Sequence, residues 1–172
     1  MNELLRFYRV PVVTASHLIG AAIAFLTPAD ALTQFPGLVT CVDILSIVYP
    51  ALLGYIKYSA MSGVTALYFM VEAVAGLLIG AVLCQHPTWL IPNGKQALQK
   101  FGHLSTLYLL LGCSFSLALF WFSLAYASRP LTLLPIHNSR MALATIGPLF
   151  AWAPCIMLAM TVSIYKTWRD HA

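Results

Sequence analysis

Two carboxylates lie inside long apolar stretches of the chain, and they are the residues best suited to chemistry. Glu72 lies within residues 63–84, and Asp43 lies within residues 38–56. A charged carboxylate at the centre of a bilayer costs roughly 2.5–3.5 kcal/mol on insertion scales, so it is expected to face other helices, a cavity or a partner. A carboxyl group in a dry site can donate or accept a proton. We therefore predict that Glu72 and Asp43 are catalytic.

His17 is the third candidate catalytic residue, because it falls at nearly the same depth as Glu72. At 1.5 Å per residue, His17 lies about 10 Å and Glu72 about 13 Å from the inner ends of their apolar stretches. Tyr49 and Tyr68 fall in the same layer and are predicted to contact substrate. An imidazole beside a carboxyl group forms an acid–base pair, although a histidine in an apolar helix more often bonds a neighbouring hydroxyl or carbonyl.

Three residues near the C-terminal stretch complete the predicted substrate site. Trp152 is expected to form part of an aromatic wall around an apolar pocket. Arg140 and Asn138 precede the stretch, and their side chains suit the oxygens of an anionic headgroup or diphosphate. The alternative is that Arg140 is an interfacial arginine whose side chain extends to the lipid headgroups without binding a substrate. The aromatic residues of the predicted wall are Phe69, Trp121, Phe122 and Trp152.

Tyr68, Glu72, Gly76 and Gly80 recur every four residues and therefore share one face of a helix. Gly76 and Gly80 form a GxxxG pattern, which allows a second helix backbone to approach closely. This face is expected to point into a helix bundle, and Glu72 points with it. The geometry is the same whether Glu72 is catalytic or is a hydrogen-bonded packing residue.

Composition places these residues in a membrane protein. The chain has 172 residues, of which 60% are hydrophobic and 8% are charged, and its mean hydropathy is +0.85. A soluble domain carries about 25% charged residues, so this chain cannot cover a soluble surface of its size. The formal charge is only +4, and the basic residues form no dense run. This excludes a nucleic-acid partner. We predict an all-α class, as a polytopic integral membrane helical bundle whose partners are membrane lipids.

Five apolar stretches are long enough to cross a bilayer, which takes about 20 residues. They form one predicted transmembrane domain over residues 1–172, with spans at 10–27, 38–56, 63–84, 104–127 and 141–165. Pro50 is expected to kink the second span, and Pro148 and Pro154 to bend or unwind the fifth. With five spans, an inner N-terminus gives five basic residues inside against four outside, which predicts a cytoplasmic N-terminus.

No cofactor or metal ion is predicted. The four cysteines form no CxxC pair, and four free thiols are expected. A haem would need two histidines at matched depth on different helices, and only His17 lies clearly within a span. No His and carboxylate spacing typical of a metal site is present.

Three functions fit this pattern. The first is a small membrane enzyme that acts on a lipophilic small molecule by proton transfer from Glu72, with isomerase- or cyclase-like chemistry. The second is a non-catalytic accessory subunit of a larger membrane complex, in which Glu72 or Asp43 would pair with a basic residue of a partner. The third is a proton or ion pathway through a homo-oligomer, which five spans without an internal repeat favour least.

Overall fold

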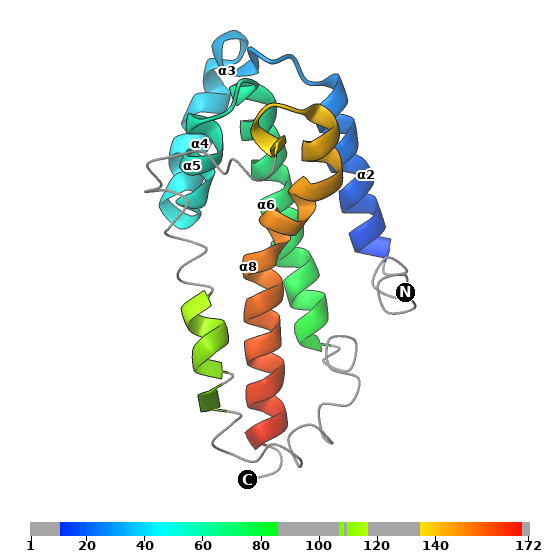
Figure 1. Cartoon of the computed structure of the whole chain (residues 1–172), viewed down its shortest axis with the longest axis vertical. Coiled ribbons are helices and arrows are strands. Elements are labelled where there is room, and N and C mark those ends of the chain that lie inside the picture. Colours follow the sequence, from blue (N-terminus) through cyan, green and yellow to red (C-terminus); the bar gives the residue numbers. More distant parts are fainter. Residues whose placement is uncertain (1–10, 86–106, 109, 117–134, 170–172) are drawn as a thin grey trace.

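The structure, a computed structural model, describes residues 11–85, 107–108, 110–116 and 135–169 (Figure 1). Within these ranges every regular element is a helix and no strand occurs, which confirms the predicted all-α class. Two of these helices, Ser62–Gln85 and Arg140–Lys166, are long and apolar enough to cross a membrane. Pro11–Leu26 and Pro36–Val48 are apolar but shorter. Trp121, Phe122 and much of the predicted span 104–127 lie outside the described residues.

Three helices form the body of the described chain, namely α2 (Pro11–Leu26), α6 (Ser62–Gln85) and α8 (Arg140–Arg169). Figure 1 shows α6 and α8 extending together toward the C-terminal end, with α2 beside their other half. The amide of Gly63, at the start of α6, donates to the carbonyl oxygen of Ala29, just past the end of α2, at 3.1 Å. α2 and α6 are therefore antiparallel neighbours.

The close approach of α6 and α8 depends on two glycines. A Cβ atom at Gly76 would lie 3.3 Å from the carbonyl oxygen of Ala151, and one at Gly80 would lie 3.1 Å from that of Cys155. Both distances are tighter than ordinary van der Waals contact, so a larger residue would push the backbones apart. Both contacts advance by four residues in the same direction, which makes α6 and α8 parallel. The predicted GxxxG face is thus the surface on which α8 packs.

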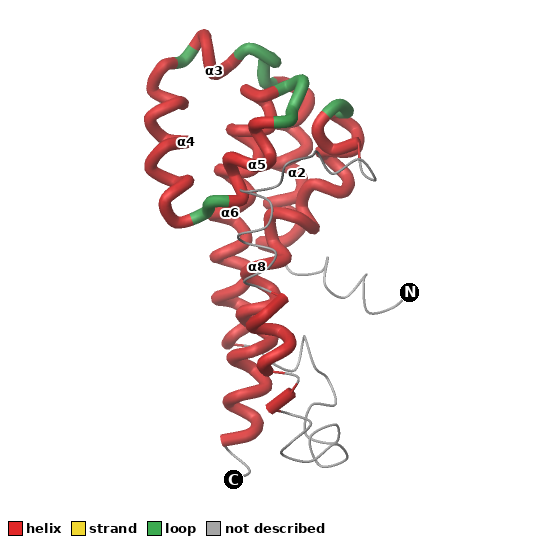
Figure 2. The backbone as a smooth tube through the Cα atoms, turned by 60° about the vertical axis from the view of Figure 1, so that its left-hand side comes forward, coloured by secondary structure: helices red, strands yellow, loops and turns green. Residues whose placement is uncertain are grey.

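Residues 38–56 do not form the single helix expected from their apolar run. They lie in two helices, α4 (Pro36–Val48) and α5 (Ala51–Lys57), which follow the short α3 (Ala31–Gln34). The chain turns back between α4 and α5, so the pair forms a helical hairpin (Figure 2). This corrects the expected kinked span: the helix ends, because a proline has no N–H for the ladder and its ring clashes with the preceding turn.

At the turn of the hairpin, which is formed by Tyr49 and Pro50, backbone groups are paired by hydrogen bonds within the hairpin. The amide of Tyr49 donates to the carbonyl oxygen of Leu45 at 2.7 Å, and the amide of Leu52 donates to that of Tyr49 at 3.0 Å. Tyr49 is buried, with 5% of its surface exposed. Irregular backbone of this kind is tolerated in an apolar environment only where protein covers it or its polar groups are paired.

The hairpin brings both of its ends to one end of the molecule. Because Gly63 bonds to Ala29, the link before α3 and the link after α5 lie together. The basic residues Lys57 and Arg140 share this end, since the amide of Ala60 donates to the carbonyl oxygen of His137 at 3.1 Å. The predicted five-span topology also places Lys57 and Arg140 on one side, but it assumes that residues 38–56 form one crossing helix.

Helix α8 stays helical through both of its prolines, Pro148 and Pro154. Its first turns run at an angle to its last turns, so the helix changes direction along its length (Figure 1). A proline inside a helix removes one hydrogen bond and displaces the turn before it, which produces such a bend. The expected bend is therefore present, whereas the expected alternative of an unwound segment is not.

His137 connects the α5 end of the hairpin to the start of α8, through the short helix η2 (Pro135–His137). Its Nδ1–H donates to the carbonyl oxygen of Tyr55 at 3.2 Å, and its own carbonyl oxygen accepts from the Ser59 hydroxyl at 3.0 Å. The side chain is buried, and this desolvation lowers the pKa of His137 below its usual value.

The unfolding free energy should therefore fall as His137 becomes protonated in the unfolded chain. The unfolded imidazole takes up a proton below about pH 6.5, while the folded one resists it, so stability is full above that pH and is lost as the pH falls. The slope from this group is at most about 1.4 kcal/mol per pH unit. Thermal unfolding in detergent across this range measures it. His137→Asn should lose this part of the pH dependence, and an unchanged profile in that variant would contradict the assignment.

Candidate functional site

Glu72 joins the three long helices through one carboxyl oxygen. Its side chain is on α6 and is fully buried, with 0% of its surface exposed. Oε2 accepts a hydrogen bond from the Ser16 hydroxyl of α2 at 2.8 Å and another from the indole N–H of Trp152 on α8 at 2.7 Å. A buried carboxyl group without partners would be strongly destabilising, so these two bonds are what allow Glu72 to lie in the core.

The other carboxyl oxygen of Glu72, Oε1, has no hydrogen-bond partner among the described residues. It is directed at Gly20 of α2, where a Cβ atom would overlap it. Because Oε2 already accepts two hydrogen bonds, we expect the proton of a neutral Glu72 on Oε1. The site therefore holds one oxygen of the carboxyl group fixed and presents the other at the contact between α2 and α6.

Tyr68 lies beside this carboxyl group, and His17 lies beside its hydrogen-bond donor Trp152. Tyr68 is fully buried one turn before Glu72, and its ring fits between two glycines. A Cβ atom at Gly20 would lie 3.0 Å from the Tyr68 ring, and one at Gly147 would lie 2.8 Å from it. The His17 ring meets Trp152 edge-on, with ring centroids 6.4 Å apart. The structure thus groups four of the predicted site residues, Glu72, His17, Tyr68 and Trp152.

Ser16 is the contact that we did not predict. Its position carries a signal, because α2 buries small residues at three- and four-residue spacing, and a small-residue stripe of this kind marks a helix contact. Ser16 is the hydroxyl-bearing member of that stripe, next to His17 in the sequence. The buried residues of the stripe are Val13, Ser16, Gly20 and Ala24.

Tyr49 is part of an aromatic cluster on the hairpin side of α6. Its ring centroid lies 6.5 Å from that of Tyr55, and the Tyr55 ring stacks on Phe69 at 3.8 Å. Phe69 in turn meets Tyr68 edge-on at 5.3 Å. The cluster therefore reaches the Glu72 site through Phe69 and Tyr68, and it also contacts α8, where Phe150 meets Tyr55 edge-on with ring centroids 6.4 Å apart. Tyr49 itself lies at the turn of the hairpin, two rings away from Tyr68.

The structure does not bring Asp43 to Glu72. Asp43 lies on α4 with an exposed side chain, whereas Glu72 is enclosed by α2, α6 and α8. The hydrogen bond at Asp43 within the described chain is to its backbone, where the carbonyl oxygen accepts from the Ser46 hydroxyl at 2.8 Å. The helix break at Pro50 explains the separation, because it turns α4 away from the body of the molecule.

Arg140 caps the C-terminal end of α2. Its Nη1 donates at 3.0 Å to each of three carbonyl oxygens, those of Ala24, Phe25 and Thr27. These carbonyls have no partners within the helix, and a cation is favourable at the negative end of a helix dipole. Arg140 lies twelve residues before Trp152, about 18 Å along α8. Arg140 and the exposed Asn138 therefore lie far from Glu72, and substrate binding by either stays a prediction.

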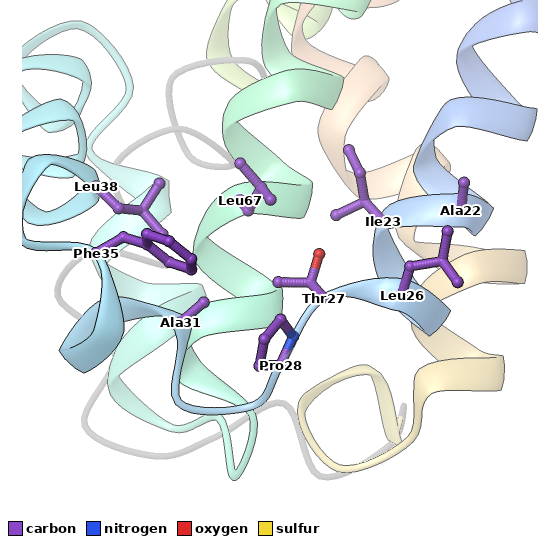
Figure 3. A pocket seen from close by; sticks show the side chains of 9 residues that line it. All are labelled: Ala22, Ile23, Leu26, Thr27, Pro28, Ala31, Phe35, Leu38 and Leu67. Atoms are coloured by element: carbon purple, nitrogen blue, oxygen red, sulfur yellow. The ribbon is translucent and has the colours of Figure 1, made fainter.

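An apolar groove of about 460 Å³ lies at the same end of the molecule, between α2, α6 and the start of α4 (Figure 3). Thr27 contributes the single hydroxyl among its side chains, which Figure 3 shows beside Pro28. The groove shares two helices with the Glu72 site but no residue. Its lining residues are Ala22, Ile23, Leu26, Thr27, Pro28, Ala31, Phe35, Leu38 and Leu67.

Metal ligands do not gather in the described part of the chain, where no group of three or more His, Cys, Asp and Glu side chains could hold a metal ion. The cysteines Cys41, Cys84, Cys113 and Cys155 are all free. The polar groups that bind Glu72 are the Ser16 hydroxyl and the Trp152 indole N–H, and the His17 ring lies beside that indole. This set can hold and move a proton.

The tight contact at Gly20 leads to a stability prediction. Gly20→Ala should lower the unfolding free energy by about 1–3 kcal/mol, because Oε1 of Glu72 can move aside only by breaking the two bonds to Oε2. Gly37→Ala is the matched control, since a Cβ atom there would meet nothing within 4 Å. Thermal unfolding of both variants in detergent measures the difference. Equal stability of the two variants would show that α2 does not pack this closely on Glu72.

A fold by itself does not identify a reaction, so function is derived from the chemistry of specific residues. At this site those residues are Glu72 and its neighbours. No protein-family model, curated protein or solved structure matches this chain.

Proposed function

We propose that the chain is an integral membrane enzyme in which Glu72 transfers a proton to a lipophilic substrate, in an isomerisation or cyclisation. The observation that supports this proposal is the asymmetry of the buried carboxyl group. Oε2 accepts bonds from Ser16 and Trp152, while Oε1 has no partner among the described residues. A neutral carboxylic acid held in this way carries its proton on a defined oxygen, which is the requirement for a general acid.

The same contacts suit the second half of a proton transfer. When Oε1 protonates a carbon–carbon double bond, the electron pair of that bond forms the new C–H bond, and a carbocation and a carboxylate result. The hydroxyl of Ser16 and the indole N–H of Trp152 stabilise that carboxylate, because charge-assisted hydrogen bonds are roughly twice as strong as neutral ones. The ring faces of Tyr68 and Trp152 favour a nearby cation. The carboxylate then removes a proton from a neighbouring carbon, and no co-reactant is consumed.

The apolar groove favours a lipophilic substrate. Ile23, in its wall, lies three residues after Gly20 on α2, about 4.5 Å along the helix axis. Leu67, on the opposite wall, directly precedes Tyr68. The groove and the Glu72 site therefore adjoin along one contact between α2 and α6. A substrate in the groove would reach Oε1 when these two helices separate near Gly20.

Glu72→Gln should abolish turnover while the protein stays folded. The amide oxygen of the new side chain can still accept from Ser16 and Trp152, but the side chain has no acidic proton, and general acid catalysis contributes about 10²–10⁴-fold. Isomerisation and cyclisation conserve mass, so substrate and product appear as two species of equal mass and different retention. Their ratio is measured by chromatography with mass spectrometry of apolar extracts from the native membranes. Cells with the unaltered chain are compared with cells that carry Glu72→Gln.

Asp30→Asn is the control, because Asp30 is an exposed carboxylate that accepts from the Gln34 amide at 2.9 Å, away from Glu72. This variant should keep the ratio found with the unaltered chain. An unchanged ratio in a folded Glu72→Gln variant would refute proton transfer by Glu72. The thermal unfolding of the three proteins shows whether each is folded.

For the membrane topology we propose four crossings and one hairpin in place of five crossings. The crossings would be α2, α6, the stretch 104–127 and α8, while α4 and α5 enter and leave from one side. By sequence order, six basic residues would then flank one face and three the other, which places the larger group in the cytoplasm. The six are Arg6, Arg9, Lys95, Lys100, Lys166 and Arg169, and the three are Lys57, Arg129 and Arg140.

Under this topology the two termini lie on the same, cytoplasmic side, whereas five crossings would put them on opposite sides. Epitope tags at each terminus, treated with protease in sealed vesicles of known orientation, distinguish the two. Both tags should be digested when the cytoplasmic face is outward, and both should be protected when it is inward. Digestion of one tag alone would contradict the hairpin and support five crossings.

A non-catalytic accessory subunit is the second candidate. The observation that favours it is the complete enclosure of Glu72 by helices of its own chain. A carboxyl group that binds Ser16 and Trp152 stabilises the packing of three helices even without a reaction. The experiment on Glu72→Gln separates the two candidates, because an accessory subunit changes no ratio of equal-mass species by proton transfer.

A further inference from the structure

The outward side of α4 carries apolar residues and one carboxylate. Val39, Asp43 and Ile47 follow one another at four-residue spacing and so form a stripe, and Ile44 and Val48 flank it. We call these five residues the outer α4 face. Exposed surface amounts to 43% for Val39, 61% for Ile44, 80% for Ile47 and 69% for Val48. Large apolar residues gathered in this way mark a surface that contacts lipid or another protein.

Asp43 distinguishes the two possibilities. Its carboxylate forms no ion pair or hydrogen bond with the described residues. Asp43 lies seven residues from the start of α4, about 10 Å along the helix, so in a membrane it sits below the headgroups. The described lysines and arginines all lie at helix ends, and they are Lys57, Arg140, Lys166 and Arg169. Lipid alone would leave the carboxylate at a cost of roughly 2.5–3.5 kcal/mol.

We propose that the outer α4 face docks against a transmembrane helix of a different protein, one that carries a lysine or arginine at the depth of Asp43. The ion pair compensates the charge of Asp43, and the apolar residues around it exclude lipid from the pair. This inference does not depend on an enzymatic function, because the face lies on the opposite side of the hairpin from the Glu72 site. It also separates the two acids: Glu72 binds within its own chain, whereas the Asp43 side chain binds none of the described residues.

A second copy of the chain is a poorer occupant. A symmetric dimer places the same patch of both copies together, so two Asp43 side chains would meet. Like charges at such a contact repel, and the pair would be stable only with a shared proton. The partner that complements the face is therefore a helix of opposite charge rather than an identical one.

Photocrosslinking in the native membrane tests this proposal. The full chain carries p-benzoylphenylalanine in place of Ile47, on the outer α4 face, or in place of Leu78, which is 56% exposed on α6 and serves as the control. We expect an adduct from position 47 alone, whose crosslinked peptide belongs to an apolar segment containing lysine or arginine in another protein. Adding Asp43→Lys should lower its yield by about tenfold or more, because repulsion replaces a desolvated ion pair.

Restoration of the adduct gives the decisive support. Changing the basic residue of the crosslinked segment to aspartate should recover the adduct with Asp43→Lys, and not with the unaltered chain. Three results would overturn the proposal: adducts to lipid alone, adducts to another segment or copy of this chain, and an adduct whose yield Asp43→Lys does not change. Asp30→Asn, at an exposed acid outside the face, should leave the yield as it was.

Discussion

The buried carboxyl group of Glu72 is the constraint on which the described bundle depends. A carboxyl group with 0% exposure must have hydrogen-bond donors, and its donors come from two other helices. The bonds from Ser16 and Trp152 therefore set the height and rotation of α2 and α8 relative to α6. In an apolar solvent, where hydrophobic burial does little to associate helices, polar contacts of this kind and close packing supply the specificity.

Glycines decide how closely those helices approach, and their spacing explains why the packing was predictable. Gly76 and Gly80 share a face with Glu72, so the helix partner on that face had to come close, and α8 does so at Ala151 and Cys155. The same reasoning applied to α2 would have found Ser16 and Gly20. That stripe is harder to recognise because alanines surround it, and only the position of Glu72 shows which small residue is the polar contact.

Asp43 and Glu72 look alike in the sequence and have opposite environments in the structure. Each lies in an apolar stretch. Depth placed Glu72 with His17 and Tyr68, and the structure groups these three with Trp152, which was predicted only as part of the aromatic wall. Depth did not predict where Asp43 and Tyr49 lie, because a depth along residues 38–56 assumes that these residues form one unbroken helix. Arg140 was predicted to bind an anion, yet its Nη1 binds three carbonyl oxygens at the end of α2, a contact between residues more than a hundred positions apart.

The sequence by itself determined the helical class, the bounds of α2, α6 and α8 to within a few residues, and the burial of the Glu72 face. These follow from composition and from four-residue spacing, which are local properties of the chain. Only the tertiary structure decided that Pro50 ends a helix rather than bending it, and that Glu72 bonds to Ser16 and Trp152. A proline permits either a kink or a break, and a carboxyl group accepts any donor within reach. The outcome in both cases depends on which residues far along the chain pack against them.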